Sequence, residues 1–235
     1  MKPVIVTTSW DDGHVLDLTL ADLLRAHGIA GTFYISPADR EVAHSKRLTA
    51  AQVAELGRDF EIGAHTLSHP RLSAIGDDEA RAEIAGSKKV LERTLGKPVT
   101  SFCYPGGDFQ EKHTAMVRDA GFSLARTTER FRTDAGADPF TLPTTAHAYR
   151  HWSDAGPIWR TNGTVVGFIR NYLRWDDLAI ALFDRVIAEG GIFHLWGHSW
   201  EIDARGDWNR LTRVLAHIAK RPGVKYAANA ELLSK

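Results

Sequence analysis

The chain has 235 residues, 43% of them hydrophobic and 25% charged, as expected for one soluble α/β domain spanning residues 1–235. Its 29 basic and 29 acidic residues give a formal net charge of zero, so the composition favours neither nucleic-acid nor membrane-surface binding. We expect no membrane span, because no segment approaches ~18 consecutive apolar residues. We also expect no signal peptide, because Lys2 and Pro3 lead straight into a strand. With Cys103 as the single cysteine, these features predict a cytoplasmic protein.

Strands and helices are predicted to alternate along most of the chain. Short apolar runs rich in β-branched or aromatic residues predict strands, and apolar residues at helical spacing predict helices. The predicted strands are 4–6, 31–35, 60–64, 99–103, 122–125, 192–196 and 224–227; the predicted helices are about 16–27, 49–56, 77–95, 111–120, 176–189, 208–220 and a short one behind the last strand. Between 127 and about 175 the alternation fails, and there we expect short strands and a helix near 165–172. About seven β/α units with right-handed crossovers predict a parallel sheet, either open or closed into a barrel.

Two adjacent carboxylates, Asp11 and Asp12, stand just beyond the first predicted strand and are followed by Gly13. Sites in α/β folds are usually assembled at such strand ends. Neighbouring strand residues point in opposite directions, so Asp11 and Asp12 are expected to have different roles unless the backbone turns there.

A histidine pair, His65 and His69, follows the third predicted strand. At this spacing the two rings lie on one helical turn or converge from a tight loop. Two imidazoles and one carboxylate form a usual hydrolytic zinc site that leaves room for water and substrate. A pair on a helix surface is the alternative, but Pro70 and the position at a strand end disfavour it. With Asp12 as the third ligand, the pattern favours a metal site.

Together these motifs resemble those of the polysaccharide deacetylases, also called carbohydrate esterase family four or the NodB homology domain. The T-F-D-D-G motif of that family appears as Thr8-Ser9-Trp10-Asp11-Asp12-Gly13, and its H-[ST]-x-x-H motif as His65-Thr66-Leu67-Ser68-His69. The resemblance implies a distorted, TIM-like (β/α)7 barrel. It also implies a divalent metal held by Asp12, His65 and His69, usually Zn2+, with Co2+ or Ni2+ possible. Asp11 would be the general base, acting on a water whose pKa the metal lowers to ~7.

The resemblance further implies a histidine at the end of a late strand that protonates the leaving amine. Two histidines compete for this role, His194 and His198. We select His198, because it ends its strand where the other site residues also lie. His194, two pleats back, is expected to be buried and hydrogen-bonded. Glu201 either orients His198 or faces solvent.

The sequence departs from the family in its third and fourth motifs. Cys103 stands where the family has an arginine that tunes the catalytic aspartate, and the aspartate-containing partner motif of that arginine is not recognisable. The absence of both the arginine and its partner is consistent with loss of the whole salt bridge between them, since a buried charge left without its partner is costly. Arg126, at the end of the fifth strand, is either the replacement partner of Asp11 or a solvated side chain. Cys103 is expected to be a small buried residue rather than a nucleophile.

The remaining candidates are substrate contacts. The loop Tyr104-Pro105-Gly106-Gly107 offers backbone N–H groups for an oxyanion. The expected oxyanion or substrate residues are therefore Tyr104, Gly106, Arg126 and Trp200, with Asp108, Trp152 and Trp159 as further residues that could shape the pocket.

The leading functional prediction is a metal-dependent hydrolase that removes an N-acyl group, such as acetyl, from an amino sugar or glycan. One alternative is an imidase or amidohydrolase acting on a small non-sugar amide. A second alternative is a non-catalytic carbohydrate- or metal-binding module. The presence of Asp11 together with all three candidate metal ligands argues against it. The expected partner is a small-molecule or glycan substrate, and the sequence leaves the oligomeric state open.

Overall fold

The computed structural model describes residues 3–162 and 164–233. Its strands are β1 (Val4–Asp12), β2 (Thr32–Ile35), β3 (Glu61–Ala64), β4 (Ser101–Cys103), β5 (Leu124–Arg126), β6 (Ala146–His147), β7 (Gly191–Gly197) and β8 (Val224–Tyr226). Its helices are α1 (Asp17–His27), α2 (Ala50–Asp59), α3 (Asp77–Leu95), α4 (Glu111–Asp119), α5 (Ala155–Asn162), α6 (Val165–Leu173), α7 (Trp175–Glu189), α8 (Ser199–Arg205) and α9 (Trp208–Ile218). Within these residues no helix is both long and apolar enough to cross a bilayer.

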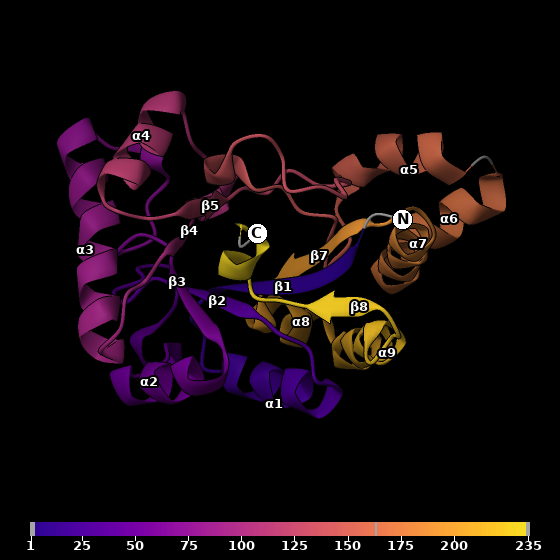
Figure 1. Ribbon diagram of the computed structural model, residues 1–235, viewed down its shortest axis with the longest axis horizontal. Coiled ribbons are helices and arrows are strands. Elements are labelled where there is room, and N and C mark those ends of the chain that lie inside the picture. The colour runs from indigo at the N-terminus through magenta and orange to yellow at the C-terminus, as the bar shows by residue number, and fades with distance from the viewer. Residues whose placement is uncertain (1–2, 163, 234–235) are drawn as a thin grey trace.

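Seven strands form one curled parallel sheet in the order β5-β4-β3-β2-β1-β7-β6, and β8 pairs with the first residues of β1. The helices surround this sheet, with α1 to α3 along one side and α7 and α9 along the other (Figure 1). Because every strand pair is parallel, the carboxyl ends of the strands meet at one rim. The predicted distorted (β/α)7 barrel is confirmed.

Local signals placed most elements correctly. Gly28 ends α1 in the left-handed conformation (φ 66°), and Thr49 and Gln52 form the predicted capping box of α2. The helix expected near 165–172 is α6. The helices α5 and α8 were not predicted, and the C-terminal segment forms a 3-10 helix.

The central strand β1 is longer than predicted, running to Asp12 rather than ending at Val6. Its middle residues Thr7, Thr8 and Ser9 are fully buried although they are polar. Each hydroxyl is hydrogen-bonded, that of Thr7 to Asn229, for example, and that of Ser9 to His194. Such partners remove the cost of burying a hydroxyl. They lie far away in the sequence, so hydrophobic patterning could not reveal this part of the strand.

Candidate metal and catalytic site

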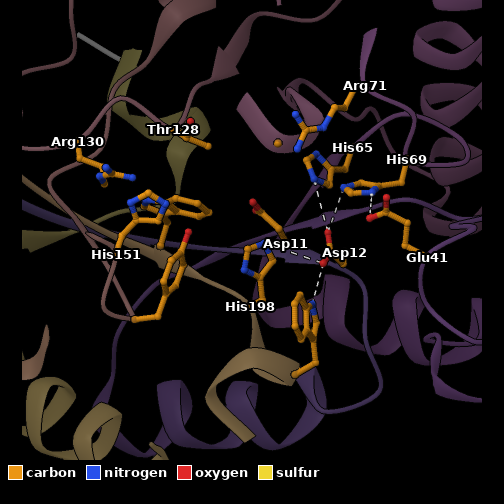
Figure 2. A pocket seen from close by; sticks show the side chains of 14 residues that line it. Asp11, Asp12, Glu41, His65, His69, Arg71, Thr128, Arg130, His151 and His198 are labelled. Carbon is orange, nitrogen blue, oxygen red and sulfur yellow. Dashed lines mark hydrogen bonds and ion pairs between the residues drawn. The ribbon is translucent and has the colours of Figure 1, made fainter. Parts of the chain in front are cut away.

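Residues from three strand ends line one cavity of about 360 Å³ at the carboxyl rim of the sheet. Asp11 and Asp12 end β1, His65 and His69 follow β3, and His198 follows β7. Figure 2 shows their side chains converging, with His65 and His69 above Asp12 and His198 beside it. The structure therefore brings together all five residues expected to bind metal or catalyse.

Asp11 and Asp12 face the same cavity because the backbone turns at Asp12, whose φ is 81°. A non-glycine residue seldom adopts this conformation, and such strain persists where the surroundings over-determine it. The next residue, Gly13, also has a positive φ of 75°, and a Cβ there would lie 2.8 Å from Cγ2 of Ile35. The carboxylate of Asp12 is held by Trp200, whose Nε1 donates to Oδ2 at 2.8 Å.

The three expected metal ligands converge through the other oxygen of Asp12. Its Oδ1 lies 3.7 Å from Nε2 of His65 and 3.4 Å from Nε2 of His69. All three ligand atoms lie within 4.8 Å of one another. Oδ1 is buried and accepts no hydrogen bond within the described part of the chain. The histidines converge from a tight loop, with positive φ at Thr66 and His69, and not from a helical turn.

A second layer of contacts fixes the orientation of both imidazoles. Nδ1 of His65 donates to the carbonyl of Cys103 at 2.8 Å, and Nδ1 of His69 donates to Glu41 at 3.0 Å. Each Nε2 then keeps its lone pair toward Asp12, as in metal sites whose ligating histidines bond to a carbonyl or carboxylate. Burial lowers the pKa of His65 to about 4, so its ring is neutral near pH 7. The donor set therefore fits a divalent metal of the zinc type.

Asp11 is paired with Arg126, the replacement partner considered from the sequence. The guanidinium of Arg126 is fully buried and donates to Oδ1 of Asp11. Burial by itself raises the pKa of Asp11, but the charges of Arg126, His65 and His198 together lower it below the ordinary value. Cys103 is a buried thiol beside this pair, with Sγ 3.8 Å from Oδ2 of Asp11. Asp11 is therefore ionised, as a general base must be.

The two candidate histidines of β7 occupy different environments. His194 is buried outside the cavity, donates from Nδ1 to the carbonyl of Pro143 and accepts from Ser9 at Nε2. Burial lowers its pKa to about 3, so it stays neutral. His198 lines the cavity, with Nε2 3.9 Å from Oδ2 of Asp12. Burial lowers the pKa of His198, but the hydrogen bond to Glu201 and the carboxylates of Asp12 and Asp11 outweigh it and raise the pKa to about 9.

Glu201→Gln is expected to lower the pKa of His198, because the hydrogen bond from Nδ1 to Glu201 is the largest contribution that raises it. In the native protein this raised pKa adds stability that is fully present below pH 6.5 and lost as the pH rises through about 9. Histidine NMR titration of the metal-free protein measures the shift, and Glu189→Gln, an exposed change on α7, is the control. An unchanged pKa in the Glu201 variant would contradict this role.

The expected oxyanion and substrate residues divide into two groups. Gly106, with a φ of 61°, and Trp200 line the cavity. Tyr104 does not: its phenol is buried and donates to the carbonyl of Phe140, and its backbone N–H donates to Arg126. Arg126 is likewise buried behind Asp11, so its expected contact with substrate is corrected to a contact with Asp11.

Three further pocket candidates lie outside the cavity. Trp152 and Trp159 are 78% and 58% exposed, and neither is among the residues that line it. Asp108 accepts hydrogen bonds from the backbone and hydroxyl of Ser73. These expectations are therefore wrong, because the segment that carries both tryptophans turns them toward solvent.

Sequence reasoning missed seven residues that line the cavity, which are Glu41, Arg71, Thr128, Arg130, Tyr149, His151 and Trp196. Four of them lie between residues 127 and 154, where the strand–helix alternation fails. The concentration of histidines and aromatic residues there was the available signal, but it did not indicate which side chains turn inward.

A family model described as polysaccharide deacetylase matches residues 1–125, more than half of the chain. The chain belongs to the polysaccharide deacetylase family. The match contains Asp11, Asp12, His65 and His69, whereas His198 lies beyond it. The chain spans less than half the length of the curated relatives it matches. One of these, a peptidoglycan-N-acetylglucosamine deacetylase from Bacillus cereus, is 27% identical over 123 residues, which are 52% of this chain and 43% of that protein.

Two solved structures have a similar fold over almost the whole chain. The chitin deacetylase of Colletotrichum lindemuthianum has a TM-score of 0.65 at 14% identity, covering 100% of this chain and 89% of that one. A family 4 acetyl xylan esterase from Clostridium thermocellum, in complex with a cobalt ion, has a TM-score of 0.61 at 17% identity, covering 98% and 90%. At these identities the similarity establishes the barrel and nothing further.

Proposed function

We propose that this protein is a metal-dependent hydrolase that removes an N-acyl group, such as acetyl, from an amino sugar or glycan. The observation that carries the proposal is the meeting of three functions in one cavity. Asp12, His65 and His69 form a metal-ligand set, Asp11 is a carboxylate held ionised by Arg126, and His198 is an imidazole whose pKa is raised to about 9. Membership of the polysaccharide deacetylase family supports an amide as the bond that is cleaved.

The metal would be held by Asp12, His65 and His69. A bound divalent ion acts as a Lewis acid toward the substrate carbonyl and makes a water molecule easier to deprotonate. Nitrogen ligands from two imidazoles with one carboxylate favour Zn2+, and Co2+ and Ni2+ accept the same donors. The cobalt ion named with the acetyl xylan esterase is consistent with this range.

The protein groups divide the two proton transfers between them. Asp11, ionised and directed into the cavity, takes a proton from the attacking water. His198, protonated and fixed by Glu201, gives a proton to the amide nitrogen as the C–N bond breaks, which leaves a carboxylic acid and an amine. Gly106 has no side chain to exclude the substrate, and its backbone N–H is the candidate donor to the developing oxyanion.

An imidase or amidohydrolase acting on a small amide is the second candidate. The observation that favours it is the cavity itself, which is walled by Tyr149, His151 and Trp196 opposite the ligand set. Its volume of about 360 Å³ lies in the range of small-molecule sites. A cytoplasmic location stays a prediction from the sequence.

Metal content and acyl release together test the proposed function. We expect about one divalent ion per chain by elemental analysis, acetate release from an N-acetylated amino sugar or glycan, and loss of turnover after chelation that Zn2+ or Co2+ restores. Circular dichroism after chelation checks that the barrel stays folded. Full turnover by the metal-free protein would exclude this mechanism. Release from cyclic imides but not from sugars would select the second candidate.

A further inference from the structure

One wall of the cavity has no part in the mechanism above. It is formed by Thr128, Arg130, Tyr149 and His151, all from the segment between β5 and α5. Figure 2 shows Arg130 and His151 on the side of the cavity opposite His65 and His69, with Asp11 between the two sides. A substrate whose acyl group lies at Asp11 is therefore positioned to place a second group of the same molecule at this wall.

Arg130 is fixed in place from behind. Its Nη2 donates to Oγ of Ser153 at 2.6 Å and lies 3.1 Å from Oδ1 of Asp154. Asp154 is only 2% exposed, and its other oxygen accepts from Nε2 of His147 at 2.7 Å. Within the part of the chain that the structure describes, Nε and Nη1 of Arg130 have no hydrogen-bond partner. These two donors remain available on a guanidinium that already lines the cavity.

His151 is held as a second donor by the same serine. The backbone N–H of Ser153 donates to Nδ1 of His151 at 3.2 Å, and Oγ of Ser153 lies 2.7 Å from that nitrogen. Because Oγ already accepts from Arg130, its own hydrogen is directed to Nδ1. A neutral His151 must then carry its proton on Nε2. Burial raises the pKa of Tyr149 to about 12, so its phenol also keeps its proton as a donor.

The wall thus offers the guanidinium of Arg130 and Nε2–H of His151 as donors, two hydroxyls that donate or accept, and no carboxylate lining the cavity. A carboxylate or phosphate only accepts, so it can use all the donors of this wall at once, and a guanidinium edge binds it through two parallel hydrogen bonds. Of the carboxylates elsewhere in the cavity, Asp11 pairs with Arg126, Glu41 pairs with His69, and Asp12 belongs to the proposed metal-ligand set. A second guanidinium, that of Arg71, also lines the cavity, but it lies beside His65 on the opposite side and is not part of this wall (Figure 2). An anion is the ligand that satisfies such a surface.

We propose that the substrate carries, in addition to its N-acyl group, an anionic substituent, a carboxylate or a phosphate, that Arg130 and His151 bind. This inference rests on the proposed function and narrows its substrate class to anionic N-acylated amino sugars. Arg130 would bind the anion through the edge that carries Nε and Nη1, and His151 would add a hydrogen bond from Nε2.

Three ligands that share one N-acetyl group and differ only at C6 test this proposal: N-acetylglucosamine, its 6-phosphate and its C6 uronate. Calorimetry with the metal-loaded Asp11→Asn protein measures binding without turnover, and wild-type protein gives kcat/KM. We expect at least one anionic ligand to bind about 10- to 100-fold more tightly than the neutral sugar. The larger of the two ratios identifies phosphate or carboxylate as the group.

Arg130→Gln is expected to bring this anionic-to-neutral ratio close to one, and His151→Ala to reduce it about 3- to 10-fold. The His151 variant still tests the proposal if Arg130→Gln misfolds. The buried Asp154 pairs with Arg130 and His147, so removing His151 leaves those ion pairs intact. Arg132→Gln is the matched control, since Arg132 lies on the same segment but pairs with Glu129 and Asp134 at the surface; its ratio should equal that of the wild type.

Equal affinity for all three ligands, or equal behaviour of the Arg130 and Arg132 variants, would overturn the proposal. Acetate release with the same kcat/KM from neutral and anionic sugars would overturn it while leaving the proposed function intact. Selective binding that depends on Arg130, without any hydrolysis, would support the anion site and count against the proposed function.

Discussion

Asp11→Asn is expected to reduce acyl release about 10²- to 10⁴-fold while the protein keeps its metal, because asparagine cannot accept the proton of the attacking water. His69→Ala is expected to abolish both turnover and metal binding, since it removes one of three ligands whose donor atoms lie within 4.8 Å of one another. Acetate release and elemental analysis of each purified variant measure the two effects.

Two surface substitutions serve as controls for these variants. Asp22 pairs with Arg25 on the exposed side of α1, and His44 lies in an exposed turn, so Asp22→Asn and His44→Ala should keep wild-type turnover and metal content. Thermal unfolding of all four variants shows whether a loss of activity reflects loss of folded protein. Wild-type turnover in the Asp11 variant would show that the base is another group, and full metal content in the His69 variant would show that the ligand set is different.

Arg126→Met is expected to destabilise the protein by about 3–5 kcal/mol, because it leaves the carboxylate of Asp11 buried without its counter-charge. Acyl release should fall with it, since without Arg126 burial raises the pKa of Asp11 and favours the protonated form, which is no base. Chemical denaturation measures the stability and acetate release the activity. In the Arg126 variant, the raised pKa of Asp11 costs stability only at pH values above the pKa of an aspartate in the unfolded chain. The loss of stability relative to the wild type should therefore become smaller as the pH falls toward that value.

A double variant separates the structural effect of this pair from its chemical effect. Arg126→Met combined with Asp11→Asn removes both charges, so we expect much of the stability to return while activity stays absent. Arg81→Met is the matched control, because Arg81 forms an exposed, 3.6 Å ion pair with Asp119 at the surface. Wild-type stability in the Arg126 single variant would mean that Asp11 is stabilised by something other than this arginine.

The parallel sheet and the convergence of the metal-ligand candidates were readable from the sequence for a shared physical reason, whereas closure into a distorted (β/α)7 barrel was implied by the family resemblance. Apolar periodicity and capping residues are local signals, and parallel strands joined by right-handed crossovers bring their carboxyl ends to one rim. Asp12, His65 and His69 each follow such an end closely, so chain order by itself predicted their meeting. The choice of His198 over His194 followed from the same geometry, and the structure places only His198 in the cavity.

What only the tertiary structure decided depends on contacts between distant parts of the chain. The turn at Asp12 that directs both carboxylates into one cavity is a backbone conformation that no residue pattern announces. Arg126 reaches Asp11 because β5 pairs with β4 in the register that sets Arg126 beside the small side chain of Cys103. The donor wall around Arg130 depends on Asp154, buried in a segment with no regular periodicity. The sequence thus determined the alternation of strands and helices and the ligand motifs, whereas long-range packing decided the order of the strands in the sheet, which charges are paired and which donors face the substrate.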